Sequence, residues 1–382
     1  MIEAAAKCQL RGGRCAGLAV YTTPTPRIAP LIFGFSVLPR LDTVLVPVPD
    51  IPRRSEKRMK FGTPHAALLA LALISVAGAQ TSPVGPVQRV ADTPLIAPSG
   101  HGIDAAGTFN PAAVKVGDQT ILLYREQDKG GTSRIGYASS RDGIHFQIRP
   151  QPVLTPEAPY EQGGGVEDPR LIRIGSTWYL TYTGYNRKVA QLCMATSTDL
   201  IHWHRLGVIL DNHSVVWNKG WAKSGAILPV KVRGHYYMYF IGDTSGRTHE
   251  TGIARSADLR HWTPLGTRPV LPVRPGYFDS NVVEPGPPPI LTSRGILLFY
   301  NGADEHFHFG LGWALFDRNH PTHLLARASK PLLLPELPWE KQGQVPNVVF
   351  TEGLIQGPHH ALTFYYGAAD HAIGAARSTL LW

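Results

Sequence analysis

The chain has 382 residues, of which 43% are hydrophobic, and this is enough for one large core or two smaller ones. Its net charge of +9 is concentrated near the N-terminus: residues 1–60 contain ten Lys and Arg against four Asp and Glu, which leaves a surplus of only three for the remainder. This distribution argues against a basic groove, so we expect no nucleic-acid partner.

Residues 59–79 are typical of a secretory signal peptide. Lys60 and the basic residues before Met59 precede the short apolar run AALLALALISVA, and the small residues 77–79 fit cleavage before Gln80. A membrane span needs about 20 apolar residues, so the run is too short for one. We expect an exported protein, periplasmic or extracellular, with no membrane segment after cleavage. A buried apolar helix is the alternative.

Residues 1–58 are unusual, because a signal peptide normally opens a protein. They lack sustained periodicity and contain Cys8 and Cys15, two of the three cysteines. We expect an unstructured leader and interpret it as a mis-called start, with translation beginning at Met59. Only Cys193 remains after cleavage, so no intramolecular disulfide can form in the exported chain.

Residues 80–382 contain an internal repeat of about sixty residues. Small-residue strands recur around Ala138, Ala195, Ala254, Ala314 and Ala376, with spacings of 57, 59, 60 and 62 residues. An aromatic-rich strand precedes each of them, as in ILLYRE and YYMYFIGD, and a third phrase comes before that strand, as in FNPAAV and EDPRLI. Three or more strands per unit in five units predict an all-β, five-bladed β-propeller. A β-sandwich or a β-helix is the alternative.

The segment GGGVEDPRL, residues 163–171, is the strongest candidate for a functional site. Pro169 is expected to hold Asp168 in an extended strand, and the glycines permit a ligand to approach the backbone closely. Asp168 is therefore the leading catalytic candidate. A turn cap or a salt bridge to Arg170 is the structural alternative.

The first strand of each propeller blade usually lines the central channel, so the repeat predicts which residues meet there. The repeat position of Asp168 is occupied in the other units by Asn110, Ser224, Gly286 and Glu352, and Glu284 stands two residues before Gly286. Polar residues at a position that should be apolar suggest a site. Asp168, Glu284 and Glu352 would supply the paired carboxylates of glycoside cleavage, one as the acid and one to activate water.

Other residues complete the predicted site. Arg125, Arg170, Lys223 and Asn110 can bind hydroxyl groups or adjust carboxylate pKa values. Aromatic residues at strand ends and in loops could stack on sugars or pack within the blades: Tyr124, Tyr185, Tyr300, Trp217 and Trp221. No spacing of histidines resembles a zinc motif, so we expect no metal and no cofactor.

Seven motifs resemble, in order, those of glycoside hydrolase family 130, the five-bladed propellers that act on β-mannosides: FNPA, YRE, GGGVEDPRL, WAKSGAI, EPGPPPI, YNGAD and VPNVVFTEG. The resemblance covers about residues 100–380. It implies an oligosaccharide substrate and an inverting mechanism with Asp168 as the proton donor. With Asp304 of YNGAD, the predicted substrate-binding residues are Asn110, Arg125, Arg170, Lys223, Asp304 and Glu352.

The family contains both hydrolases and phosphorylases, and the sequence favours hydrolysis. Gln191 and Val282 occupy positions where the resemblance places phosphate-binding cations, and Glu284 would repel phosphate. We therefore predict a β-mannoside hydrolase with Asp168 as general acid and Glu284 as general base. One alternative is a phosphorylase that uses inorganic phosphate as a co-substrate and releases mannose 1-phosphate.

Two further alternatives remain. Families 32, 43 and 68 are also five-bladed propellers, but their first blade usually offers an acidic residue where this chain has Asn110. A non-catalytic propeller that binds glycans would explain the repeats, although it does not require acidic residues on inner strands. The sequence does not predict the oligomeric state or the glycan linkage.

Overall fold

The computed structural model describes residues 81–382 except 211–214 and 245. Every described residue belongs to one compact unit. The predicted leader and signal peptide, residues 1–58 and 59–79, lie outside the described residues. No helix in the described part is long and apolar enough to cross a membrane.

The described chain consists mainly of strands, which confirms the all-β prediction. The strands form three hydrogen-bonded sheets of nine, eight and four strands, and within these sheets the antiparallel pairs of strands fall into five successive groups along the chain. The first group is β2 (Gly107–Val116), β3 (Gln119–Gln127), β4 (Ser133–Ser140) and β5 (Gln147–Ile148), and the second is β6 (Gly165–Ile174), β7 (Thr177–Tyr185), β8 (Ala190–Ser197) and β9 (His204–Val208). The third is β10 (Ala222–Ile227), β11 (Tyr236–Asp243), β12 (His249–Ser256) and β13 (Thr263–Leu265).

The fifth of the groups includes a strand from the other end of the described chain. The fourth is β14 (Val282–Pro285), β15 (Ile290–Leu291), β16 (Ile296–Ala303), β17 (Phe309–Phe316) and β18 (Leu324–Arg327). The fifth is β19 (Val349–Gln356), β20 (Ala361–Ala368) and β21 (Ala372–Thr379), to which β1 (Gln88–Arg89) adds an edge strand. Short helices lie between strands: η1 (Gly102–Asp104), η2 (Pro159–Glu161), α1 (Pro338–Lys341) and η4 (Pro358–His360).

The five groups coincide with the sequence repeat. Each repeated alanine lies on the strand that follows the aromatic-rich strand of its group and is completely buried. Its cross-strand partner is a large apolar residue, such as Leu122 opposite Ala138 and Phe364 opposite Ala376. A small residue opposite a large one fills the space between packed sheets without overlap, which explains why alanine recurs at this position.

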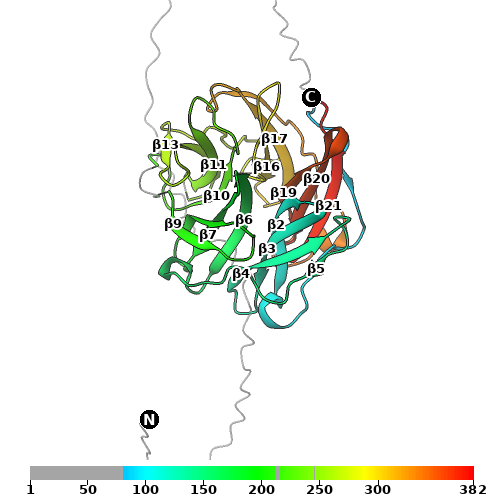
Figure 1. Ribbon diagram of the computed structural model, residues 1–382. Helices are drawn as coiled ribbons and strands as arrows, with labels where there is room; N and C mark the ends of the chain where they lie inside the picture. Colours follow the sequence, from blue (N-terminus) through cyan, green and yellow to red (C-terminus); the bar gives the residue numbers. More distant parts are fainter. Residues whose placement is uncertain (1–80, 211–214, 245) are drawn as a thin grey trace, which may run out of the picture. The chain divides into compact units, whose positions relative to one another are not determined.

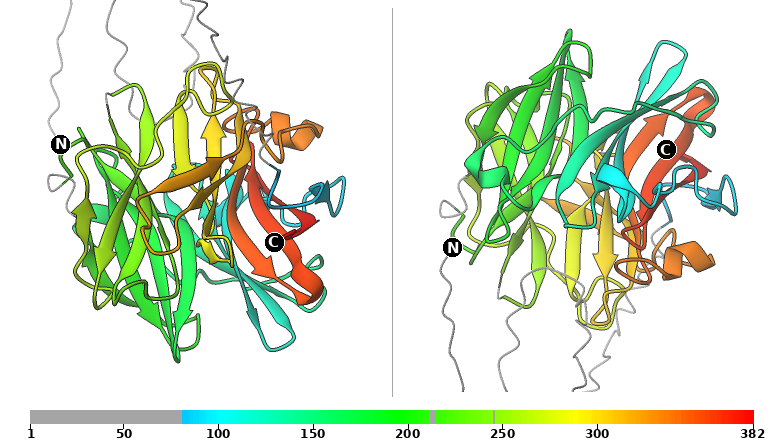
Figure 2. Two further views of the ribbon diagram at one scale, coloured as in Figure 1. Left: turned by 90° about the horizontal axis from the view of Figure 1, so that it is seen from above. Right: turned by 90° about the horizontal axis from the view of Figure 1, so that it is seen from below.

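The first strands of the groups contact one another. β2 contacts β6 and β19, and β10 contacts β6 and β14; Figure 1 shows β2, β6, β10 and β19 close together. β1 pairs antiparallel with β21, and both views of Figure 2 show the segment before β2 (blue) beside the last strands (red). The two ends of the described chain therefore meet in one sheet.

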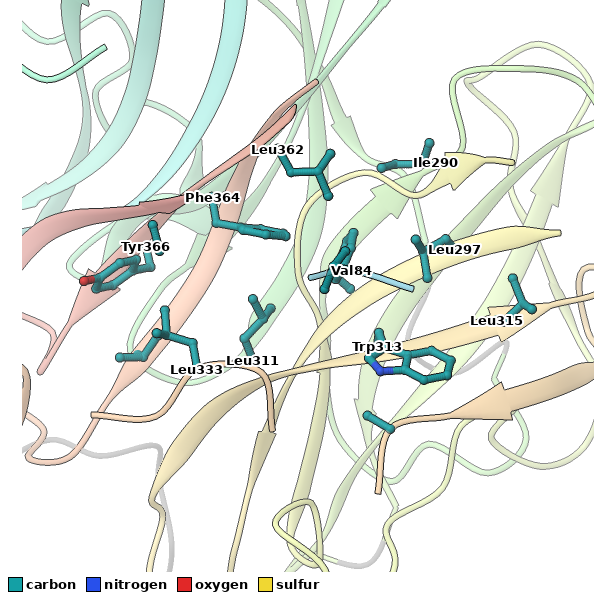
Figure 3. Packing of buried hydrophobic residues seen from close by; sticks show 14 of the residues in the cluster. Val84, Ile290, Leu297, Leu311, Trp313, Leu315, Leu333, Leu362, Phe364 and Tyr366 are labelled. Atoms are coloured by element: carbon teal, nitrogen blue, oxygen red, sulfur yellow. The ribbon is translucent and has the colours of Figure 1, made fainter. Parts of the chain in front are cut away.

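Apolar side chains fill the space between the fourth and fifth groups. Figure 3 shows Leu311 and Trp313 of β17 in one cluster with Phe364 of β20, and Val84 from the segment before β1 lies among them. Phe299 and Phe364 meet edge to face, with ring centroids 4.9 Å apart. The N-terminal segment of the described chain thus contributes to the core that it closes.

A buried carboxylate ties β1 to the same group. Glu340 of α1 is completely buried, accepts a hydrogen bond from Tyr366 Oη at 2.8 Å and forms an ion pair with Arg89 Nε at 2.7 Å. The second group repeats the arrangement with Glu161, which accepts from Tyr182 Oη at 2.8 Å and pairs with Arg205. Each carboxylate has a cation and a hydroxyl partner, as burial of a charge requires.

Glu126 of β3 lacks such compensation and gives a pH-dependent prediction. It is buried, and burial, followed by the charge of Asp104, raises its pKa to about 7. The folded state therefore holds this proton more tightly than the unfolded chain, and stability falls as the pH rises from 4.5 through about 7. We expect Glu126→Gln to stabilise the protein by up to about 3 kcal/mol at pH 8 and not at pH 4. Urea unfolding at both pH values measures this, and an equal effect at the two would contradict it.

Candidate active site

The position predicted to carry the site is a repeated β-bulge on the first strands. Asn110, Asp168 and Ser224 have positive φ angles of 50°, 52° and 60°, and the strand register shifts at each of them. The register also shifts at Glu352. The prediction that Pro169 keeps Asp168 extended is therefore wrong. Residues other than glycine rarely adopt positive φ, and such conformations cluster at functional sites.

The triple glycine serves packing between strands. A Cβ atom at Gly165 would lie 2.1 Å from the carbonyl oxygen of Ser133, and one at Gly164 would lie 2.2 Å from the ring of Tyr185. Gly165 bridges β6 to β4 in parallel with Ser133. The close approach that was predicted for a ligand is thus made by the neighbouring strand.

The bulges bring several predicted site residues around one cavity of about 50 Å³. Its lining combines a polar set, which we call the charged wall, with an apolar set, which we call the apolar wall. The charged wall is Asn110, Arg125, Asp168, Lys223, Glu284 and Asp370, and the apolar wall is Phe307, Phe309, Val345, Val348 and Phe350. A larger surface hollow of about 470 Å³, near Gln356 and His360, contains none of the predicted residues. We therefore take the smaller cavity as the candidate site.

Asp168 is the most strongly contacted carboxylate of the cavity. Its Oδ1 accepts hydrogen bonds from Asn110 Nδ2 at 2.9 Å and Arg125 Nη1 at 3.3 Å, and its Oδ2 lies 3.6 Å from Lys223 Nζ. Burial disfavours the charged form, but Arg125 and Lys223 outweigh it and lower the pKa of Asp168 to about 2. Asp168 is therefore ionised at neutral pH.

Glu284 shares Lys223 with Asp168. Lys223 Nζ lies 3.0 Å from Glu284 Oε1 and 3.6 Å from Asp168 Oδ2, which limits the separation of the two oxygen atoms to the sum of these distances, 6.6 Å. Ser224 also donates its hydroxyl proton to Glu284 Oε1. Inverting glycosidases hold their two carboxyl groups about 6.5–9.5 Å apart, so this pair is at or below the lower end of that range.

Arg170 and Glu352 are not among the residues that line the cavity. Arg170 donates to the carbonyl oxygens of Asp168 at 3.1 Å, Pro285 at 2.7 Å and Gly286 at 3.0 Å, and it pairs with Glu352 at 3.0 Å. Glu352 is completely buried, and burial raises its pKa well above the usual value. Arg170 thus tethers the backbone on either side of the site, and its predicted role in binding substrate is replaced by one in positioning.

Asp304 is also absent from the lining. Its Oδ1 accepts hydrogen bonds from the backbone N–H groups of His306 at 2.9 Å and His308 at 3.0 Å. The carboxylate therefore shapes the loop between β16 and β17, which carries Phe307 to the cavity. Its predicted contact with substrate stays a prediction.

Sequence reasoning missed Asp370 and the apolar wall. Ala369 and Asp370 both have φ of 49° in the tight turn between β20 and β21, and the turn aims Asp370 at the cavity. Burial raises the pKa of Asp370 to about 6, against the opposing charge of Arg125. The similar phrases GAD in YNGAD and GAAD in YYGAAD mark the turns that follow β16 and β20. The aromatic residues predicted to stack, Tyr124, Tyr185, Tyr300, Trp217 and Trp221, do not line the cavity.

The described charged residues of the site are not arranged as metal ligands. Within residues 81–382, apart from the five undescribed positions, no three His, Cys, Asp or Glu side chains are placed to bind one ion. Arg125 and Lys223 instead provide two cations beside Asp168. The arrangement combines a carboxylate with the donors needed to hold hydroxyl groups or an anion.

Known proteins resemble this chain in sequence. A sequence model of glycoside hydrolase family 130, described as beta-1,4-mannooligosaccharide phosphorylase, matches residues 98–381. The 1,2-beta-oligomannan phosphorylase of Thermoanaerobacter sp. (strain X514) is 36% identical over 301 residues, 76% of this chain and 96% of that protein.

Solved structures are also similar. The beta-1,2-mannobiose phosphorylase from Listeria innocua, in complex with beta-1,2-mannobiose, has a TM-score of 0.68 and 27% identity over 77% of this chain and 97% of the other. A second structure has a TM-score of 0.70 and 34% identity over 77% of this chain and 94% of the other. Its description states that the family of mannoside phosphorylases contains glycoside hydrolases that target beta-1,2 mannosidic linkages in Candida mannan.

Proposed function

Because the chain belongs to glycoside hydrolase family 130, we propose that it cleaves β-mannosidic linkages of oligosaccharides by inverting phosphorolysis, with inorganic phosphate as co-substrate and mannose 1-phosphate as product. The names of the curated relatives support this alternative better than the hydrolysis predicted from the sequence. The observation that carries the proposal is the pair of cations beside Asp168 in one cavity.

The charge state of Asp168 links the proton donor to phosphate. A general acid must carry a proton, yet Arg125 and Lys223 by themselves keep Asp168 ionised. A phosphate anion next to these two cations would offset their charge and raise the pKa of Asp168. Asp168 would then become protonated when phosphate is bound. Water, being neutral, would leave the pKa of Asp168 low.

The reaction then needs one displacement. A phosphate oxygen attacks the anomeric carbon, the bond from that carbon to the leaving oxygen breaks, and Asp168 donates its proton to the leaving oxygen. The proton that phosphate carries returns to Asp168. Asn110, Arg125 and Asp370, which line the cavity around Asp168, would bind the hydroxyl groups of the mannosyl unit.

Hydrolysis is the second candidate, and Glu284 is the observation that favours it. Glu284 lines the same cavity, and a carboxylate there would repel phosphate and could activate water. Val282, where the resemblance places a phosphate-binding cation, is buried and apolar in the cluster around Phe309. Against hydrolysis, the limit of 6.6 Å on the separation from Asp168 leaves little room for a sugar and water between the two carboxylates.

Product analysis distinguishes the two candidates. The purified protein is incubated with β-1,2- or β-1,4-mannobiose, with and without inorganic phosphate. We expect mannose 1-phosphate and mannose in equal amounts, and only when phosphate is present. Release of free mannose alone, at the same rate without phosphate, would contradict phosphorolysis. Glu284→Gln sharpens the comparison, because it abolishes hydrolysis and leaves phosphorolysis within about tenfold of the parent.

Three proposals extend beyond the described geometry. We infer that the five strand groups are the blades of a five-bladed β-propeller over residues 80–382, which the contacts among the first strands support. We also retain a cleaved signal peptide at residues 59–79 and hence an exported enzyme, and a mis-called start for residues 1–58. Peptides from residues 1–58 in native protein, detected by mass spectrometry, would refute the last of these.

A further inference from the structure

The candidate cavity is too small for its proposed substrate. Binding pockets for small molecules enclose about 300–1,000 Å³, whereas this cavity has about 50 Å³. One water needs a cavity of roughly 10–15 Å³, so this cavity has room for a few waters. A sugar can enter only if part of the lining moves.

Phe307 is the apolar lining residue whose backbone is strained, as Asn110, Asp168 and Asp370 are among the polar ones. It lies in the loop Asp304–His308 between β16 and β17, is half-buried, and has a φ of 59°. A bulky aromatic residue in the left-handed region is a genuine outlier, and strain of this kind marks segments that switch between conformations. A return of Phe307 to negative φ would relieve the strain and withdraw the ring.

Contacts within the loop and packing against an apolar cluster hold Phe307 in place. Asp304 holds the closed form: its carbonyl oxygen accepts from Phe307 N at 3.0 Å, and its Oδ2 lies 3.2 Å from His308 Nδ1. The Phe307 ring packs against a small apolar cluster that includes Phe309 and Phe350, which belong to the apolar wall. Phe307 therefore belongs both to this apolar cluster and to the lining that includes Asp168.

We propose that Phe307 is a gate that closes the empty cavity and, after the substrate enters, stacks on the sugar that leaves. This inference rests on the proposed function for the identity of the substrate. A sugar ring carries hydroxyl groups on its edge and C–H groups on its faces. The charged wall can bind the edge, and an aromatic ring is a matching surface for the face.

The test measures the association rate constant and the dissociation constant of β-mannobiose separately. It uses Asp168→Asn protein, so that β-mannobiose is bound without being cleaved. We expect Phe307→Ala in this background to increase the association rate constant of β-1,2-mannobiose at least tenfold, measured by stopped-flow tryptophan fluorescence. We also expect its dissociation constant to rise at least tenfold, because the stacking surface is lost. Tyr277→Ala removes an exposed aromatic residue outside the cavity and should change neither constant.

Two further variants identify the cause. Phe307→Gly removes both the ring and the backbone strain, so it should behave like Phe307→Ala if the ring is the gate. In the otherwise unchanged enzyme, Phe307→Ala should raise KM at least tenfold with kcat within threefold, a split that general destabilisation does not produce. Phe307→Tyr should restore KM.

The outcomes are distinguishable. Unchanged rate and dissociation constants in Phe307→Ala, with mannobiose bound by the parent, would overturn the gate and leave the proposed function intact. A change in Phe307→Gly alone would assign the effect to the backbone and also overturn the role of the ring. If the parent binds neither β-1,2- nor β-1,4-mannobiose, the proposed function fails, and the inferred stacking on a leaving sugar fails with it.

Discussion

Asp168→Asn is expected to lower kcat by about 10²–10⁴ while β-mannobiose still binds within about tenfold of the parent. The side chain keeps its shape and its contacts with Asn110 and Arg125, but an amide cannot deliver a proton to the leaving oxygen. Both readouts come from initial rates with phosphate and from calorimetric titration of mannobiose. This outcome is expected for phosphorolysis and for hydrolysis alike, because both need a proton donor.

The matched control is Asp128→Asn. Asp128 also forms an ion pair with an arginine, Arg134, but it lies in the loop between β3 and β4 and does not line the cavity. Its replacement should leave kcat within twofold. If Asp168→Asn retained more than a tenth of the parent activity, Asp168 would be removed from the reaction, and Asp370 would become the next candidate for the proton donor.

The sequence predicted the strands well because the repeat appears five times. A single phrase such as EDPRLI is ambiguous, but its recurrence before each aromatic strand identifies the first strand of every group. The structure places a register shift at four of the five aligned positions, Asn110, Asp168, Ser224 and Glu352, whereas Gly286 follows the end of β14. Periodicity therefore identified residues that lie together although they are far apart in the chain.

The bulge itself was missed, although the sequence contains a signal for it. Asn110 and Asp168 are followed by proline, and Ser224 and Glu352 by glycine. Proline usually keeps the residue before it extended, and the prediction of an extended Asp168 depends on this effect. The recurrence of Pro or Gly at one repeat position could instead have indicated a local break in pairing, since both residues interrupt a regular strand.

The roles of single residues were harder to predict than their positions. Arg170 and Asp304 were assigned to substrate by charge, yet one binds backbone carbonyls and the other caps its own loop. Phe307 and Asp370 reach the cavity because a turn residue adopts positive φ, and a one-dimensional sequence does not reveal where such a turn points. Side-chain direction in loops depends on tertiary contacts that the repeat does not encode.

Arg170→Lys is expected to destabilise the protein by about 3–5 kcal/mol and to abolish most activity. Arg170 is almost completely buried, and its fork-shaped head group contacts three carbonyl oxygens and Glu352 at once. Lysine has one nitrogen and cannot satisfy all four partners. The backbone of Asp168 and that of Pro285, next to Glu284, would lose their common tether. Urea unfolding measures the first effect and initial rates measure the second.

A double variant separates these two effects. Arg170→Met with Glu352→Gln removes the buried cation together with its carboxylate partner, and replacing a whole buried pair is far less costly than breaking it. We expect this variant to recover at least half of the lost stability and to remain inactive. Recovery of activity along with stability would show that Arg170 serves the fold alone. Because the tether joins the strand of Asp168 to that of Glu284, continued inactivity in a stable protein would instead assign Arg170 to positioning the reacting groups.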